Sequence, residues 1–122
     1  MSQSILVIDD NQDFLASITM LLRARGFEVH AAESGTDGLK MLEELSPAVV
    51  ITDLNMPKPD GFDIATSVME SRSKPSLFIM SGLPNSPIYF RVAEQLGAER
   101  CFQKPVDMQM LCDAVAREIS RQ

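Results

Sequence analysis

Cysteine and histidine are scarce in this sequence, and their spacing leaves few roles for them. The two cysteines, Cys101 and Cys112, form neither a CxxC pair nor a zinc-binding spacing. We expect both thiols to be reduced and packed in the interior, as free cysteines usually are. The single histidine, His30, has no cysteine near it in the sequence and makes a poor metal site by itself. The usual zinc patterns are therefore excluded.

Basic charge and long apolar runs are also lacking. With 11 Lys and Arg against 17 Asp and Glu, the net charge is −6, which disfavours nucleic-acid binding because phosphate contacts need a basic surface. No apolar run is long enough to span a membrane, and residues 1–4 show neither the basic region nor the cleavage pattern of a signal peptide. We therefore expect a cytoplasmic protein that binds neither nucleic acid directly nor a membrane.

The 122 residues contain no repeat, low-complexity tract or linker, which predicts a single domain over 1–122. Short apolar runs alternate along the chain with residues at helical spacing. The expected strands lie at about 4–9, 27–32, 48–53, 77–80 and 100–104, and the expected helices at about 12–25, 35–45, 62–71, 88–96 and 107–119. Such alternation predicts an α/β fold of five βα units, with a five-stranded parallel sheet covered by helices on both faces.

The second expected strand, 27–32, differs from the other strands in its pattern. Glu28 and His30 alternate with apolar residues there, as in an edge strand, whereas the first, third and fourth strands are nearly continuous apolar runs. The pattern thus indicates that 27–32 lies at an edge of the sheet. The fold that we expect is a doubly wound (βα)5 fold with the flavodoxin-like strand order 2-1-3-4-5.

Polar residues stand at the ends of four apolar runs. Asp9 and Asp10 follow the first run, Asp53 ends the third, and Ser81 and Lys104 follow the fourth and fifth. Because the carboxyl ends of parallel strands meet at one edge of the sheet, we expect these side chains to lie together there. Each alone is most often a turn former, a cap or a surface residue, but their coincidence at one edge indicates a functional site.

This set of groups suits a divalent cation and a phosphoryl group. Close carboxylates repel one another, and a hard cation such as Mg²⁺ removes that repulsion through oxygen ligands. Asp53 can act as a nucleophile, because carboxylates form aspartyl-phosphate intermediates. Lys104 would supply a positive charge and Ser81 a hydroxyl donor to the phosphoryl oxygens, while Gly82 leaves room for close approach.

The whole chain resembles a receiver domain of bacterial two-component response regulators. The resemblance covers all five βα units and rests on four motifs in order: Asp9-Asp10, Asp53-x-x-Met56-Pro57-x-x-Asp60-Gly61, Ser81-Gly82 and Lys104-Pro105. It implies a phosphoprotein of a phosphorelay whose phosphorylation switches partner binding. It also implies a protein that is not an enzyme toward other substrates and catalyses only its own phosphorylation and dephosphorylation.

For the acidic residues, the resemblance implies one phosphoacceptor and a metal site. Asp53 would take a phosphoryl group from a histidine kinase or a histidine phosphotransfer protein, in a reaction that depends on Mg²⁺, with Mn²⁺ as an alternative ion. Asp10, Asp53 and the backbone carbonyl of Asn55 would bind the metal directly. Asp9 would bind it mostly through water.

For the phosphoryl group, the resemblance implies that Lys104 pairs with it, that Ser81 is the switch hydroxyl, and that the Lys104–Pro105 peptide bond is cis. One position departs from the family pattern, because Cys101 stands where a switch aromatic is usual. We therefore hypothesise that output depends on movement of the loop 82–87, which contains two prolines, in place of an aromatic side chain.

The resemblance places an unknown downstream protein on the face formed by the helix at 88–96, the strand at 100–104 and the last helix. Receivers joined to winged-helix DNA-binding domains usually carry acidic residues before the switch aromatic. Glu99 fits that pattern and Arg100 does not, which disfavours that mode of dimerisation. The sequence fits both a stand-alone receiver and a receiver cut from a larger regulator.

Three other functions compete with this interpretation. A phosphatase of the haloacid dehalogenase type would also use an aspartyl phosphate and Mg²⁺, but Asn55 stands where it needs a general acid. A flavodoxin-like cofactor binder would need a hydroxyl-rich phosphate loop after the first strand, where residues 9–13 are largely acidic. The third is a receiver-like module that binds its partner without phosphorylation.

Overall fold

Five strands and five helices alternate along residues 4–122, the part of the chain that the computed structural model describes. The strands are β1 (Ser4–Ile8), β2 (Glu28–Ala32), β3 (Val49–Asp53), β4 (Ser76–Ser81) and β5 (Ala98–Gln103), and the helices are α1 (Gln12–Ala24), α2 (Gly35–Leu45), α3 (Gly61–Glu70), α4 (Ser86–Gln95) and α5 (Met108–Arg121). Every expected element is present, with its ends shifted by a few residues at most. Lys104 lies just beyond the end of β5.

The strands form one parallel sheet in the order β2-β1-β3-β4-β5, which confirms the predicted doubly wound topology. Every residue of β1 and β3 is buried, whereas β2 mixes exposed and buried positions at the edge of the sheet. The pattern of each strand thus matches its place in the sheet, since central strands of a parallel sheet are covered on both faces.

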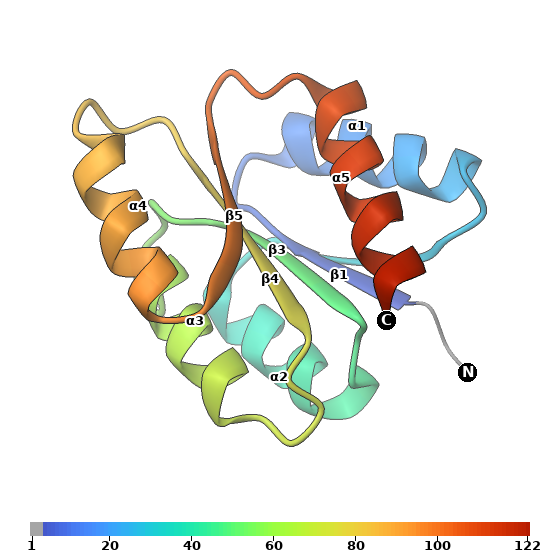
Figure 1. Cartoon of the computed structure of the whole chain (residues 1–122), viewed down its shortest axis with the longest axis horizontal. Coiled ribbons are helices and arrows are strands. Elements are labelled where there is room, and N and C mark those ends of the chain that lie inside the picture. The colour runs from blue at the N-terminus through green and yellow to red at the C-terminus, as the bar shows by residue number, and fades with distance from the viewer. Residues whose placement is uncertain (1–3) are drawn as a thin grey trace.

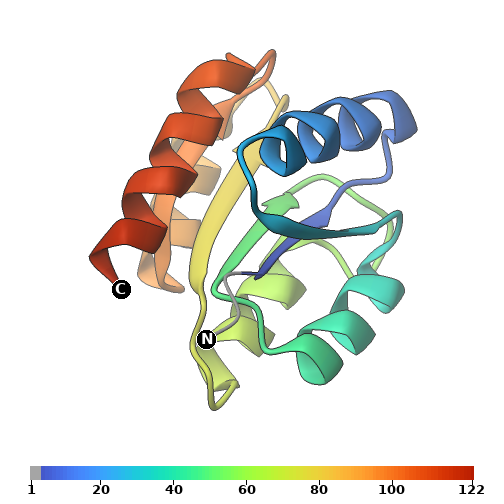
Figure 2. The same ribbon diagram turned by 90° about the vertical axis from the view of Figure 1, so that its right-hand side faces the viewer.

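Helices cover the two faces of the sheet unequally (Figures 1 and 2): α1 and α5 lie on one face, and α2, α3 and α4 on the other. Each face has its own apolar core, which includes Ile18, Leu22, Leu111 and Val115 under α1 and α5, and Leu42, Ile64, Val68 and Ala93 under the other three helices. Within residues 4–122, no helix combines the length and the apolarity needed to cross a membrane.

The helix starts differ in how they are capped. Side chains cap four helices by accepting a backbone N–H of the first turn: Asn11 for α1, Ser34 for α2, Asp60 for α3 and Asp107 for α5. Helix α4 has no such bond from its N-cap, Asn85, and it begins at Ser86, two residues before the predicted start. The first turn of α4 is therefore held by contacts other than a side-chain cap from Asn85.

Candidate functional site

Three carboxylates meet at the carboxyl edge of the sheet. Asp9 follows β1 and is fully buried, Asp10 is exposed, and Asp53 ends β3 with 5% of its surface exposed. They come together because β1 and β3 are neighbours, with Ile8 paired to Thr52. One oxygen from each carboxylate can be chosen so that all three lie within 4.8 Å of one another.

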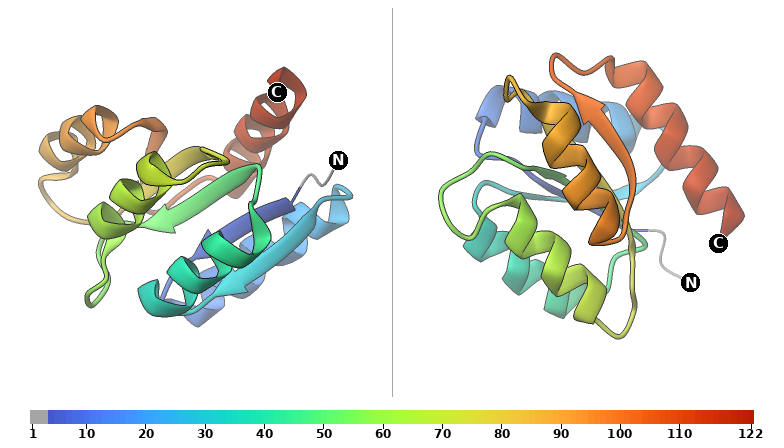
Figure 3. Two further views of the ribbon diagram at one scale, coloured as in Figure 1. Left: turned by 90° about the horizontal axis from the view of Figure 1, so that it is seen from below. Right: turned by 60° about the vertical axis from the view of Figure 1, so that its left-hand side comes forward.

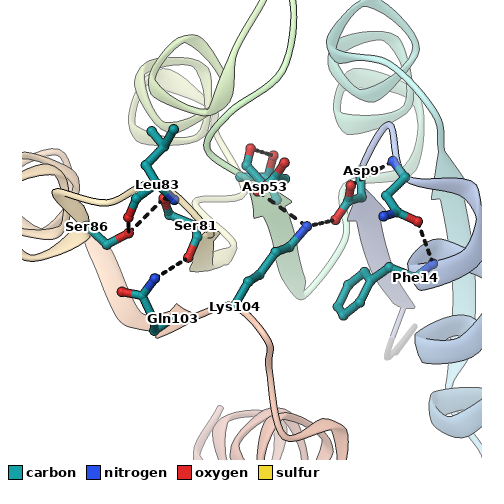
Figure 4. A network of polar contacts seen from close by, with 10 residues as sticks. Asp9, Phe14, Asp53, Ser81, Leu83, Ser86, Gln103 and Lys104 are labelled. Atoms are coloured by element: carbon teal, nitrogen blue, oxygen red, sulfur yellow. Dashed lines mark hydrogen bonds and ion pairs between the residues drawn. The ribbon is translucent and has the colours of Figure 1, made fainter.

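Lys104 reaches into this acidic group from the end of β5 (Figure 4). Its Nζ donates to Asp9 Oδ2 at 2.8 Å and lies 3.5 Å from Asp53 Oδ1. The ammonium also stands 4.9 Å from the centre of the Phe14 ring, within the range of a cation–π contact. Asp9 is therefore the closer ionic partner of Lys104, and Asp53 is the more distant one.

The two buried carboxylates differ in how well they are satisfied. Asp9 accepts from Lys104 Nζ and, through Oδ1, from the Asn11 N–H at 2.9 Å. Asp53 Oδ1 is buried and has no hydrogen-bond partner within residues 4–122. Its contact with the Lys104 ammonium, at 3.5 Å, is an ion pair only. Buried acceptors without a hydrogen bond are uncommon, and such an acceptor indicates that an ion or a ligand binds to it.

Burial raises the pKa of Asp53 from its usual 3.8 to about 6. The Lys104 ammonium lowers this pKa, whereas the neighbouring charges of Asp9 and Asp10 raise it. The charged form of Asp53 is thus destabilised by desolvation and by like charge, and a cation would offset both. The site fits Mg²⁺ in its donor set, since this ion prefers oxygen ligands and is commonly held by one or two carboxylates.

The backbone after Asp53 is held by β4 and by the start of α3. The Leu54 N–H donates to the Met80 carbonyl at 2.8 Å, and the Gly61 N–H donates to the Leu54 carbonyl at 3.1 Å. A Cβ on Gly61 would lie 2.5 Å from Leu54 Cα and 2.7 Å from the Asp53 carbonyl oxygen. Glycine is therefore required there, so that α3 can begin directly against the end of β3. Asn55 lies in this loop with its side chain exposed.

Ser81 belongs to a second polar group, on the α4 side of the site. Its Oγ accepts from the Leu83 N–H at 3.1 Å and is hydrogen-bonded to Ser86 Oγ at 3.0 Å. Its carbonyl accepts from the Lys104 N–H at 2.8 Å and from Gln103 Nε2 at 3.2 Å. The structure thus places the Ser81 backbone beside Lys104, while its hydroxyl is engaged toward α4 (Figure 4).

Two residues of this region, Phe14 and Ser86, were not predicted from the sequence to belong to the site. Phe14 fits the apolar stripe of α1, and no pattern marks it as the ring beside Lys104. Ser86 lies in a loop-like stretch between two prolines, where nothing distinguishes it from an ordinary turn residue. Both contacts join residues from different elements, so only the packing of the helices on the sheet reveals them.

Cys101 and Phe102 point to opposite faces of β5, as successive residues of a strand must. Cys101 packs on the α4 side, with Sγ 3.9 Å from the Phe90 carbonyl, and burial together with the Glu94 charge raises its pKa to about 11. Phe102 packs on the α1 and α5 side, with its ring 6.0 Å from that of Phe78. Phe102 therefore does not supply the aromatic that Cys101 lacks.

The Lys104–Pro105 and Lys58–Pro59 peptide bonds are both cis. The second of these was not anticipated from the sequence. Pro59 lies in the loop between β3 and α3 and packs against the start of α2, where a Cβ on Gly35 would overlap the Pro59 carbonyl.

The profile of the response regulator receiver domain matches residues 5–116. The chain belongs to this family. The receiver domain is 34% identical over 117 residues to the transcriptional regulatory protein PrrA of Mycobacterium tuberculosis, a match that covers 95% of this chain and 48% of PrrA. It is 30% identical over 115 residues to the chemotaxis protein CheY of Treponema pallidum, covering 92% of this chain and 79% of CheY.

Solved structures agree with this assignment. The receiver domain superposes on a response regulator receiver domain protein from Clostridium thermocellum with a TM-score of 0.89 and 36% identity, over 99% of this chain and 96% of that one. The chemotaxis protein CheY4 of Vibrio cholerae shares the fold, with a TM-score of 0.86 at 23% identity over 96% of this chain and 98% of that one. The chain spans about half the length of the PrrA regulators it matches. As a family, receiver domains of response regulators interact with histidine kinases and downstream effectors.

Proposed function

We propose that this receiver domain is a phosphorylation-dependent switch. Asp53 accepts a phosphoryl group from a histidine kinase or a histidine phosphotransfer protein, in a Mg²⁺-dependent reaction that changes the affinity for a downstream protein. The observation that carries this proposal is the buried Asp53 Oδ1, which faces an ammonium at 3.5 Å but has no hydrogen bond within residues 4–122. An oxygen free of hydrogen bonds keeps its lone pairs available for attack.

In the proposed reaction, a carboxylate oxygen of Asp53 attacks the phosphorus of the donor. The bond from phosphorus to the donor's leaving atom breaks, and its electron pair departs with the donor, for example on an imidazole nitrogen of a phosphohistidine. The protein's contribution is positioning and charge neutralisation. Lys104 supplies its ammonium to a phosphoryl oxygen, a step supported by its present position between Asp9 and Asp53.

The metal is assigned to the acidic edge of the site. In this proposal Asp10, Asp53 and the Asn55 carbonyl hold Mg²⁺ directly, and Asp9 holds it through water. When bound, the ion offsets the charges of the carboxylates and of the phosphoryl oxygens. The close approach of the three carboxylates within residues 4–122 supports this assignment.

The downstream protein is assigned to the face of α4, β5 and α5 (Figure 3, right). Large apolar side chains stand exposed there, with exposed fractions of 62% for Ile88, 42% for Val92 and 57% for Met110. The helix that carries the first two begins beside Ser81, so a change at the phosphorylated site reaches this face by a short path.

Intact mass after incubation with Mg²⁺ and acetyl phosphate tests the proposal. The wild type and the surface control Asp37→Asn should each gain one phosphoryl group, and Asp53→Asn should gain none. The gain should disappear when EDTA replaces Mg²⁺. A wild type that binds Mg²⁺ but gains no mass, from acetyl phosphate or from a phosphorylated histidine phosphotransfer protein, would contradict the proposal and favour a receiver-like module that works without phosphorylation.

A further inference from the structure

Ser86 and Ser81 form a closed hydrogen-bonded loop at the start of α4 (Figure 4). Both residues are fully buried. Ser86 Oγ lies 2.6 Å from the Leu83 carbonyl oxygen and 3.0 Å from Ser81 Oγ, and the Leu83 N–H donates to Ser81 Oγ at 3.1 Å. These bonds lie at the first turn of a helix whose N-cap residue makes no side-chain cap.

Two donors hold the Ser81 hydroxyl oxygen on the α4 side. Ser86 Oγ is the donor in its contacts with the Leu83 carbonyl at 2.6 Å and with Ser81 Oγ at 3.0 Å, so these two acceptors share its one proton. Ser81 Oγ accepts from Ser86 Oγ and from the Leu83 N–H at 3.1 Å. Both lone pairs of the Ser81 hydroxyl are therefore engaged toward α4.

We infer that Ser86 is a positioning residue that holds the Ser81 hydroxyl away from the phosphoryl site in the unphosphorylated protein. The inference rests on the proposed function, in which Ser81 donates its hydroxyl proton to a phosphoryl oxygen on Asp53. For that bond the Ser81 hydroxyl has to turn from α4 toward Asp53, so phosphorylation has to break the bond between Ser81 and Ser86. Ser86 thus sets how readily Asp53 is phosphorylated.

The same contact links the site to α4. The Ser81 backbone is tied to β5 through its carbonyl, which accepts from the Lys104 N–H at 2.8 Å, so the change falls on the Ser81 side chain. When the Ser81 hydroxyl turns away, Ser86 Oγ loses a buried acceptor, and the first turn of α4 loses a contact that joins it to β4. Cys101 offers no aromatic ring that could join the Ser81 hydroxyl to the face of α4, β5 and α5. In this chain, the contact with Ser86 joins them.

The variant Ser86→Ala isolates this contact. Its fold should persist, because the Leu83 carbonyl keeps the Ser86 backbone N–H at 3.2 Å and Ser81 Oγ keeps the Leu83 N–H at 3.1 Å when both lose the Ser86 hydroxyl. NMR couplings between Hα and Hβ of Ser81, in the unphosphorylated protein, report its side-chain rotamer. We expect one rotamer in the wild type and in the surface control Ser120→Ala, and averaged couplings in Ser86→Ala. One shared rotamer in all three proteins would overturn the inference.

Phosphorylation by acetyl phosphate provides the second measurement. The rate constant, followed by intact mass, should rise about fivefold in Ser86→Ala, the factor that corresponds to about 1 kcal/mol for one neutral hydrogen bond. In a Ser81→Ala background the same substitution should change the rate by less than about twofold, since a double-mutant cycle isolates the pair. An equal effect in both backgrounds, or none in either, would overturn the inference.

The two measurements separate the inference from the proposed function. If the wild type takes up no phosphoryl group, the proposed function fails, and the Ser81 couplings alone decide whether Ser86 fixes the hydroxyl. If the wild type is phosphorylated and the couplings do not respond to Ser86→Ala, the proposed function stands and the role of Ser86 is refuted.

Discussion

Replacing Asp53 with asparagine should stabilise the metal-free protein at neutral pH, and this gain should shrink as the pH falls. Burial raises the pKa of Asp53 from 3.8 to about 6, so the folded protein holds this proton more tightly than the unfolded chain does. The stability that this proton contributes is fully present below a pH near 4 and is lost as the pH rises through 6. Above that pH, the buried charge destabilises the fold.

The size of the effect follows from the two pKa values. The difference between 3.8 and about 6 corresponds to about 3 kcal/mol at a pH of about 7.5 and to about 1 kcal/mol at a pH of about 4.5. Asparagine has nearly the same shape and carries no charge at either pH, so it should recover these amounts. The value of about 3 kcal/mol is an upper limit, because water at the open side of the site screens the charge.

Urea denaturation in EDTA at the two pH values measures this gain as a difference in unfolding free energy. The exposed Asp37 supplies the control, since Asp37→Asn removes one negative charge without removing a buried one. Saturating Mg²⁺ should reduce the difference in unfolding free energy between the wild type and Asp53→Asn, because a metal that the wild type binds more tightly stabilises the wild type more. A gain that is the same at both pH values, or a less stable Asp53→Asn at neutral pH, would refute the reasoning.

Two further predictions concern residues around the site. Gly61→Ala should lower the unfolding free energy by about 2 kcal/mol, since its Cβ would press on backbone atoms. Gly82→Ala is the control and should lower it much less, because its Cβ would lie 3.5 Å from the nearest side-chain atom. Equal losses of unfolding free energy in urea denaturation would contradict this prediction. Iodoacetamide at pH 8 should label neither Cys101 nor Cys112 in the folded protein, because burial raises the pKa of both thiols; rapid labelling counted by mass would show that either thiol is open.

Cys101 stands where the family usually has an aromatic residue, and its place in strand β5 makes this difference structurally important. The sequence sets an aromatic residue, Phe102, next to Cys101, which suggests that the ring is merely displaced by one position. Because side chains of a strand alternate, that single step carries the ring to the opposite face of the sheet, against Phe78. The α4 side is left with a thiol, and the contact between Ser81 and Ser86 is the polar link that the structure offers there.

Much of the fold could be predicted from the sequence because the relevant patterns are local. Buried parallel strands need continuous apolar runs, and helices on a sheet need apolar positions at a spacing of three or four residues, so the ten elements are visible in single segments. The mixed pattern of 27–32 likewise marked β2 as an edge strand. The error at the start of α4, which begins at Ser86 and not near 88, arose because no capping side chain marks that end.

Local patterns in the sequence specify which residues end the strands, and the parallel sheet then brings Asp9, Asp10, Asp53, Ser81 and Lys104 to one edge. Tertiary structure alone decided how these groups pair. Lys104 bonds to Asp9, 95 residues away, at 2.8 Å and leaves the nearby Asp53 Oδ1 without a hydrogen bond from any of residues 4–122. The Ser81 hydroxyl accepts from Ser86 Oγ. Such choices depend on differences of less than 1 Å between side chains from separate elements, which packing sets and local sequence does not encode.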